Sequence, residues 1–256
     1  MSVDYKLESK ITTITLNRPE AYNAIDVRTL KELHDALIAF RDNEDAWVGI
    51  ITGAGDKAFC SGADIAEMLP FLKTNANKPW EIPQTPLGDM ELYKPLIGAI
   101  NGIAFGGGLE IALICDIRIA VEHARFGCSE VNLGIMPGWG ATQRLPRIIP
   151  RSKATELVFS GKPISAQEAY RIGLVNEVVP KMELMARAQK WAEDLCQVSP
   201  LGIRAAKEAM IRGYSLPLDE GLKLESALFS YLLGTEDFVE GRDAFLNKRK
   251  PQFKGK

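Results

Sequence analysis

Cysteine, histidine and net charge are all scarce in this chain, and each shortage excludes a class of protein. The four cysteines form no CxxC pair and only two histidines are present, so we expect neither a disulfide framework nor a metal site. The net charge of −2 argues against a nucleic-acid partner. No apolar run approaches the length of a membrane span, so no membrane partner is expected.

The composition is that of a globular protein. Apolar residues make up 46% of the 256 residues and charged residues 25%, which is enough to bury a substantial core. The first ten residues, MSVDYKLESK, lack both the apolar centre of a signal peptide and the arginine-rich character of a transit peptide. A cytoplasmic location is therefore expected.

Strand and helix patterns divide the chain into two regions. Residues 11–16 and 47–52 are predicted strands, and between them Asp26 is the predicted N-cap of an amphipathic helix. Beyond about residue 180 the patterns are almost only helical. The helices predicted there are 182–197, 199–214, 218–233 and 236–249. We therefore predict an α/β core over residues 1–195 and a helical region over 196–256.

The segment 97–116, IGAINGIAFGGGLEIALICD, has the most informative pattern. A predicted strand leads through glycines 106–108 into a helix. Glycines let the backbone approach a ligand, and the first N–H groups of a helix lack partners inside it, so this turn can bind an oxyanion. Glu110 follows one turn later. It is either a carboxylate that complements the helix dipole or a general acid/base beside the oxyanion site.

A second loop of small residues, GAGDKAFCSGADI, spans 53–65. Its letters match the dinucleotide-binding fingerprint, but it does not run straight into a helix and no strand ending in an acid follows at the required distance. We interpret it as another loop whose amides approach a ligand. A helix is expected to begin at Ala63, which would make the N–H of Ala63 a free donor.

The segment 70–88 contains four prolines and little periodicity, which is typical of an irregular loop or a short broken helix; a loop of this length either covers a functional site or is disordered. Farther along, Glu130 stands in an irregular segment ahead of glycines and a proline. Taken alone, Glu130 is typical of a solvated surface acid, and only the rest of the sequence could indicate a functional role for it.

The chain resembles the crotonase, or enoyl-CoA hydratase/isomerase, superfamily nearly from end to end. The matching segments are LNRPEAYNAI, FCSGADIAEM, INGIAFGGGLEIALICDIRIA, ARFGCSEVNLGIMPG, GATQRLPR, SGKPISAQEAYRIGLVNEVVP and EGRDAFLNKRKPQF. The resemblance implies an α/β fold, a crotonase-like spiral of ββα units with a C-terminal helical region that mediates trimerisation. It also implies a homotrimer or a dimer of trimers.

The resemblance further implies an acyl-CoA substrate. Coenzyme A is then part of the substrate, and no separate cofactor is expected. By motif position the backbone amides of Ala63 and Gly107 would hold the thioester oxygen. Glu130 would be the main proton donor and acceptor, Glu110 would hold and activate a water molecule, and Gly138 would add a backbone contact to that water.

Other residues are assigned by the same resemblance to the binding of coenzyme A. The loop that contains Ser61, Asp64 and Ile65 would hold it largely through main-chain groups. Phe229 and Lys248 would contribute from the C-terminal helices, often those of a neighbouring subunit. Lys248 is equally typical of a solvated tail, and Ala66 stands where relatives often carry a lysine, which weakens a phosphate contact there.

The acyl pocket is assigned to Met68, Trp80 and Trp139. Trp139 either narrows the acyl tunnel or packs in the core. The predicted function is the reversible hydration of a 2-enoyl-CoA to a 3-hydroxyacyl-CoA. The alternatives are an isomerase that uses Glu130 alone, a hydro-lyase acting on a branched, cyclic or carnitinyl thioester, and a non-catalytic or RNA-binding relative, which the net charge disfavours.

Overall fold

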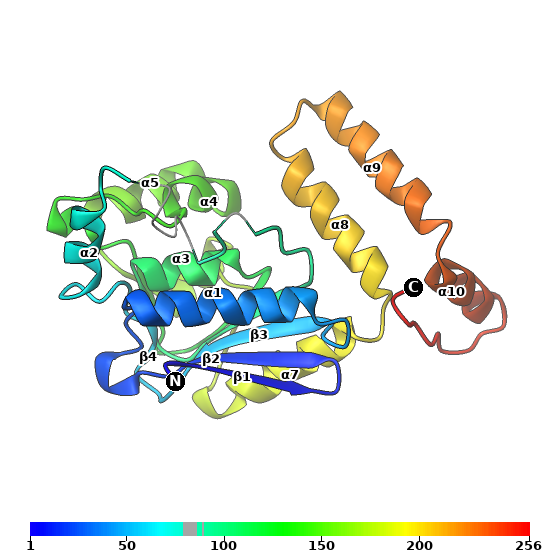
Figure 1. Ribbon diagram of the computed structural model, residues 1–256, viewed down its shortest axis with the longest axis horizontal. Coiled ribbons are helices and arrows are strands. Elements are labelled where there is room, and N and C mark those ends of the chain that lie inside the picture. Colours follow the sequence, from blue (N-terminus) through cyan, green and yellow to red (C-terminus); the bar gives the residue numbers. More distant parts are fainter. Residues whose placement is uncertain (79–85, 89) are drawn as a thin grey trace.

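Parallel pairing between strands far apart in sequence organises the fold, which the computed structural model describes for residues 1–78, 86–88 and 90–256 (Figure 1). Six described strands form a large sheet, in the spatial order β1 (Val3–Glu8), β2 (Ile11–Leu16), β3 (Val48–Gly53), β5 (Leu96–Ile100), β7 (Ile117–Val121) and β10 (Glu177–Val179). Four shorter strands form a second sheet, in the order β4 (Ala58–Cys60), β6 (Ile103–Phe105), β8 (Arg125–Gly127) and β9 (Ile164–Ser165). Among the strand pairs of the described residues, only β1–β2 and β8–β9 are antiparallel.

The helices and the two sheets together make a spiral. The described helices are α1 (Val27–Asp42), α2 (Met68–Thr74), α3 (Gly107–Ile114), α4 (Ala141–Ile148), α5 (Arg151–Ser160), α6 (Ala166–Arg171), α7 (Leu184–Leu195), α8 (Pro200–Gly213), α9 (Leu218–Leu232) and α10 (Glu236–Leu246). The chain passes repeatedly from the large sheet to the small sheet and then into a helix, as in β3–β4–α2 and β5–β6–α3. This arrangement confirms the predicted ββα spiral.

The central strands are apolar because both of their faces are covered. Every residue of β3 and β5 is buried, as expected for parallel strands with helices on both sides of the sheet. Helix α1 lies on one side of the large sheet and α7 on the other (Figure 1). Asp26 caps α1 as predicted, since its Oδ1 accepts the Thr29 N–H at 2.6 Å.

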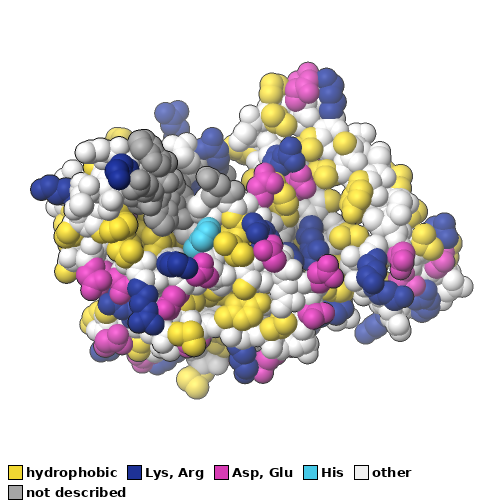
Figure 2. Space-filling model, viewed as in Figure 1, with side chains coloured by type: hydrophobic (Ala, Val, Ile, Leu, Met, Phe, Trp, Pro, Cys, Tyr) yellow, Lys and Arg dark blue, Asp and Glu magenta, His cyan; other side chains and the backbone are white. Residues whose placement is uncertain are grey.

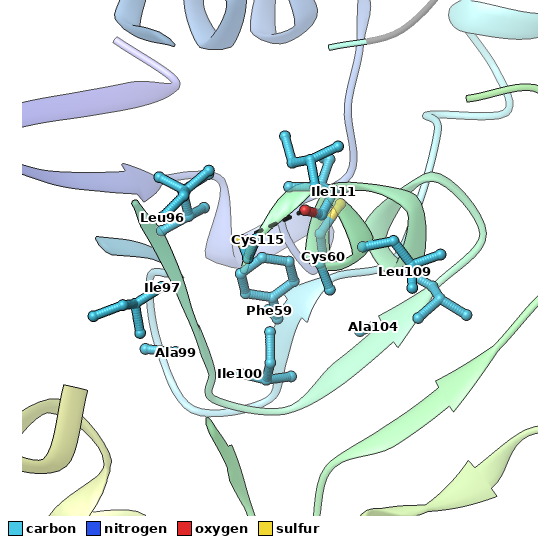
Figure 3. Close-up of a cluster of buried hydrophobic side chains, with 14 of the residues drawn as sticks. Phe59, Cys60, Leu96, Ile97, Ala99, Ile100, Ala104, Leu109, Ile111 and Cys115 are labelled. Carbon is cyan, nitrogen blue, oxygen red and sulfur yellow. Dashed lines mark hydrogen bonds between the residues drawn. The ribbon is translucent and has the colours of Figure 1, made fainter. Parts of the chain in front are cut away.

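Packing fixes helix α3, and therefore the glycine turn at its start. All eight residues of α3 are buried, and Leu109 and Ile111 pack into the cluster that includes Phe59 and Ile100 (Figure 3). At the other end of α3, the buried guanidinium of Arg118 donates to the Cys115 carbonyl. A cation at this position also complements the negative end of the helix dipole.

The C-terminal helices extend away from the spiral. Helices α8 and α9 form a projecting hairpin, and α10 lies beyond it (Figure 1). Helix α9 has no buried residue, and Figure 2 shows hydrophobic side chains on the surface of the hairpin. The four predicted C-terminal helices are confirmed within a few residues. None of the helices in the described part of the chain has the length and apolar character needed to cross a membrane.

The structure corrects one boundary and adds elements that the sequence patterns missed. The helix expected at Ala63 begins at Met68, and Ala63 instead forms a parallel bridge with Ile25. Strands β4 and β6 have three residues each, too few to show alternation. Helix α4 lies in a segment in which no helix was predicted, and it contains Pro146.

The Asn101 side chain ties the end of β5 to the β3–β4 connection. Its Oδ1 accepts the Gly53 N–H at 3.1 Å, and its Nδ2 donates to the carbonyls of Gly53, Gly55 and Ala58 at 2.9 to 3.1 Å. Asn101 is buried, so these backbone groups have little access to water as an alternative partner.

We therefore predict that Asn101→Ala lowers the free energy of unfolding by about 1–3 kcal/mol, because buried backbone groups lose their partner. Urea denaturation at one fixed protein concentration measures this loss. The matched control is Asn17→Ala, since Asn17 is exposed and its side-chain amide donates to the exposed carboxylate of Asp4. A loss for Asn101→Ala no larger than that for Asn17→Ala would contradict this role.

Candidate active site

A cavity of about 150 Å³ opens beside the glycine turn. Residues from four segments line it: the 61–65 loop, helix α2, the 106–110 turn and the 129–139 segment. The parallel strands β4, β6 and β8 bring three of these segments together, because all three strands end at the same edge of the small sheet. The lining is mostly apolar, and Glu110 and Glu130 both belong to it.

Glycine is required at the turn by close approaches of the backbone. A Cβ on Gly108 would lie 2.0 Å from the Cys60 carbonyl oxygen, which no side chain permits. Gly106 has a φ of +51°, and a Cβ there would lie 3.3 Å from Glu130 Oε1. The glycines thus allow α3 to begin directly against the β4 loop and beside Glu130.

The two backbone donors predicted from the sequence lie on adjacent loops. In the bridge of Ala63 with Ile25, Ile25 N donates to Gly62 O and Asp64 N donates to Ile25 O, each at 2.8 Å. The N–H of Ala63 therefore points to the opposite side, and the described residues provide no acceptor for it. Gly107 N, the first amide of α3, likewise has no acceptor in the described part of the chain.

The Ala63 and Gly107 loops are in contact. A Cβ on Gly62 would lie only 3.3 Å from Gly107 N. Ala63 and Gly107 both line the cavity, and the N–H group of each is without an acceptor among the described residues. The helix predicted to start at Ala63 does not start there. The N–H group of Ala63 is nevertheless an unpaired donor, as predicted, because the bridge with Ile25 does not use it.

Glu110 is almost completely buried and is held from one side. Its exposure is 2%, and its Oε1 accepts the N–H groups of Trp139 and Ala141 at 2.7 and 2.8 Å. Burial raises the pKa of Glu110 to about 7; the charge of Glu130 raises it too, whereas the two amides and Arg144 lower it. Glu110 can therefore gain or lose a proton near neutral pH.

Glu130 is half-buried, and its carboxyl group points into the protein. Neither oxygen of its carboxyl group is exposed, and neither has a hydrogen-bond partner within the described residues. Burial raises the pKa of Glu130. An unpartnered buried carboxyl group is costly, so its presence at the cavity indicates a ligand or water molecule that it serves. The solvated-acid interpretation of Glu130 is therefore wrong.

The remaining predicted binding residues are placed as follows. Ser61, Ile65 and Gly138 line the cavity, whereas the Asp64 side chain pairs with Arg18 at 3.3 Å. Phe229 is exposed on α9 and Lys248 is exposed just after the end of α10, and neither lines this cavity.

Of the predicted acyl-pocket residues, Trp139 lines the cavity and Met68 does not. Trp139 is 7% exposed, and its ring would lie 2.5 Å from a Cβ on Gly107, so it is both core and cavity wall. Met68 is fully buried in the core, and Leu69 and Leu72 face the cavity instead. Trp80 lies outside the described residues.

The sequence patterns missed the apolar rim of the cavity. Leu133, Ile135 and Met136 line it and are 51%, 45% and 68% exposed. In the sequence, three large apolar residues within four positions of a segment interrupted by glycines and a proline were a usable signal for a binding surface. Among the described residues no cluster of acids, cysteines or histidines is arranged to hold a metal ion.

Comparison with known proteins identifies the family. The family model described as enoyl-CoA hydratase/isomerase matches residues 6–256. The chain belongs to the enoyl-CoA hydratase/isomerase family. It is 42% identical to the short-chain-enoyl-CoA hydratase of Clostridium acetobutylicum, covering 95% of this chain and 94% of that one.

Two further members of the family are similar over the whole length. The (E)-benzylidenesuccinyl-CoA hydratase of Thauera aromatica is 40% identical, with both chains fully covered. The crystal structure of an enoyl-CoA hydratase from Bacillus anthracis superposes with a TM-score of 0.94 at 39% identity, again with both chains fully covered. The crotonase fold is therefore shown by sequence and by structure.

The raised pKa of Glu110 predicts a specific dependence of stability on pH. Its ordinary value is 4.5, so the folded state binds the proton more tightly than the unfolded state does. This contribution to stability is complete below about pH 4.5, is lost as the pH rises through about 7, and amounts to about 3 kcal/mol. Glu110→Gln should remove that dependence.

Urea denaturation of the parent and of Glu110→Gln between pH 4.5 and 8 provides the measurement. The stability of the variant relative to the parent should increase with pH over this range. Glu122→Gln, at an exposed acid, is the control and should follow the parent. Parallel curves for the parent and Glu110→Gln would show that the carboxyl group titrates normally.

Proposed function

We propose that this protein is a hydro-lyase that reversibly adds water to a 2-enoyl-CoA thioester and forms a 3-hydroxyacyl-CoA. The observation that carries the proposal is the unpartnered, buried carboxyl group of Glu130, which shares a cavity with Glu110. Two relatives support the reaction, the short-chain-enoyl-CoA hydratase and the crotonyl-CoA hydratase of Syntrophomonas wolfei, each 42% identical.

In this proposal the thioester oxygen accepts the N–H groups of Ala63 and Gly107. Addition of water at C3 moves negative charge onto that oxygen, and the two donors stabilise the charge as it develops. The positive end of the α3 dipole acts in the same direction. Loss of one such donor costs about 3–4 kcal/mol in comparable sites.

The two glutamates divide the proton transfers. Oε1 of Glu110 already accepts two amides, which leaves Oε2 to hold the water molecule. The water oxygen bonds to C3 while the Glu110 carboxylate takes up a proton from the water, and the proton bound to Glu130 passes to C2 as the C2–C3 double bond becomes single. Because the two acids interact electrostatically, we propose that the resting pair carries one proton.

The apolar lining of the cavity favours an uncharged acyl group. Leu69, Leu72, Leu133, Ile135 and Met136 surround the space, and no Lys, Arg or His lines it among the described residues. A second carboxylate on the acyl group, as in the substrate that names the 2,3-dehydroadipyl-CoA hydratase of Escherichia coli, would find no counter-charge here.

We also propose that the protein works as a homo-oligomer, a trimer or a dimer of trimers. Apolar side chains on α8 and α9, including Met210, Leu218 and Phe229, are more than half exposed in the single chain. Association through this hairpin would cover them and would bring Phe229 and Lys248 toward a second subunit.

Glu130→Gln should lower kcat for crotonyl-CoA hydration by about 10²–10⁴-fold, because amide protons cannot replace acid/base transfer. The dissociation constant for an unreactive acyl-CoA should stay within about twofold, since the volume of the side chain is kept. Loss of absorbance of the enoyl thioester measures the reaction, and Glu122→Gln is the control. Normal hydration by a folded Glu130→Gln variant would rule out the assigned role.

A substrate panel tests the acyl group and the reaction type together. We expect kcat/KM for crotonyl-CoA and hexenoyl-CoA to exceed that for 2,3-dehydroadipyl-CoA by at least about tenfold, because the carboxylate must be desolvated without a partner. Chromatography of the products should give 3-hydroxyacyl-CoA. Equal kcat/KM for the dicarboxylic ester would contradict the proposed acyl class, and conversion of 3-enoyl to 2-enoyl esters alone would indicate an isomerase.

A further inference from the structure

Arg144, on the first turn of α4, folds back onto the turn that holds Glu110. Its Nη1 donates to the Trp139 carbonyl oxygen at 2.8 Å. Its guanidinium is partly buried, and burial lowers its pKa while Glu110 raises it. Arginine nevertheless remains protonated in proteins, so Arg144 carries a permanent positive charge that interacts with Glu110.

The Arg144 hydrogen bond falls on the peptide group that matters most for Glu110. Glu110 Oε1 is bound by the amides of Trp139 and Ala141, which belong to the 138–139 and 140–141 peptide groups. The peptide group between them, 139–140, presents the carbonyl that Arg144 binds. Rotation of this peptide group would move one or both donors, so Arg144 fixes the orientation of the two amides that hold the carboxylate.

Gly140 makes this contact possible. Its φ is +112°, and a Cβ at this position would lie 2.1 Å from Arg144 Nη1. A side chain at 140 would push the guanidinium away from the turn. The sequence PGWGATQR therefore places a glycine where the arginine must approach the backbone.

The charges around Glu110 are few. Glu130 faces it across the cavity and disfavours its ionised form, whereas Arg144 and the two amides favour that form. The nearby Cys128 thiol is buried and neutral, since burial raises its pKa strongly. Arg144 is therefore the cation that counters Glu130 in the balance of charge on Glu110.

We propose that Arg144 is a positioning residue for hydration, which acts on Glu110 by fixing the Trp139–Gly140 peptide group and by supplying a counter-charge. The proposal rests on the proposed function, because it requires Glu110 to handle the water molecule. It assigns no contact between Arg144 and the substrate. In its absence the carboxylate would be both less well held and harder to ionise.

The test is the pH profile of crotonyl-CoA hydration by Arg144→Met, which keeps the length of the side chain and removes its charge. We expect the acidic limb of kcat/KM to move up by about one pH unit, so that activity on that limb falls about tenfold. KM should change by less than about twofold, because no substrate contact is lost. Arg147→Met is the matched control, since Arg147 is exposed and its Nη1 donates to Gln143 within the same helix.

Arg144→Lys supplies a second, more conservative test and serves if Arg144→Met does not fold. Lysine keeps the charge but loses the planar group, so the acidic limb should stay at the parental pH while kcat falls. A uniform loss of activity at every pH in Arg144→Met would indicate a structural role only and would overturn the proposal. If the acidic limb of the kcat/KM profile moved to higher pH in a folded Arg144→Lys variant, that result would overturn the proposal as well.

Glu110→Gln separates this inference from the proposed function. In that background Arg144→Met should add little further loss, because both changes act on the same group. Full additivity of the two losses would overturn the link between Arg144 and Glu110. Normal hydration by Glu110→Gln alone would instead contradict the proposed function, whatever Arg144 does.

Discussion

Two carboxyl groups kept away from water in one small cavity impose most of the constraints on this structure. Glu110 is compensated by two backbone amides, whereas Glu130 has no partner within the described residues. Such burial destabilises a fold unless it serves a ligand. It raises the pKa of both carboxyl groups, and that of Glu110 reaches about 7, where the group can exchange protons near neutral pH. Burial of the two carboxyl groups thus lowers the stability of the fold but makes the groups more reactive as acids and bases.

The rest of the spiral holds that place rigidly. The glycine turn starts a helix that is buried at every position, and the β4 loop presses against it so closely that Gly108 admits no side chain. Arg118 fixes the far end of α3, and Arg144 fixes the turn that binds Glu110. Rigid support of this kind keeps donors and acids oriented before a substrate arrives, which is how fixed dipoles lower a barrier.

Local signals in the sequence predicted what local interactions determine. The Asp26 cap depends on Thr29, three residues away, so its pattern was sufficient. The glycine turn before Glu110 was recognisable as three glycines ahead of a helical pattern, although the contacts that require glycine there, with Cys60 and Glu130, are distant in sequence. The burial of Glu130 depends on a turn more than twenty residues earlier, and only the family resemblance suggested its role. Ala63 was misplaced because a bridge to Ile25, distant in sequence, overrides the helical pattern of ADIAEM. Arg144 acts through backbone groups, which leave no pattern in a sequence.

The central claim is geometric, and a crystal structure with an unreactive enoyl-CoA analogue tests it most directly. The account predicts the thioester oxygen at about 2.7–3.1 Å from both Ala63 N and Gly107 N. It also predicts one water molecule within hydrogen-bond distance of both Glu110 and Glu130. A thioester oxygen bound elsewhere, or two acids that share no water molecule in the occupied site, would contradict the account.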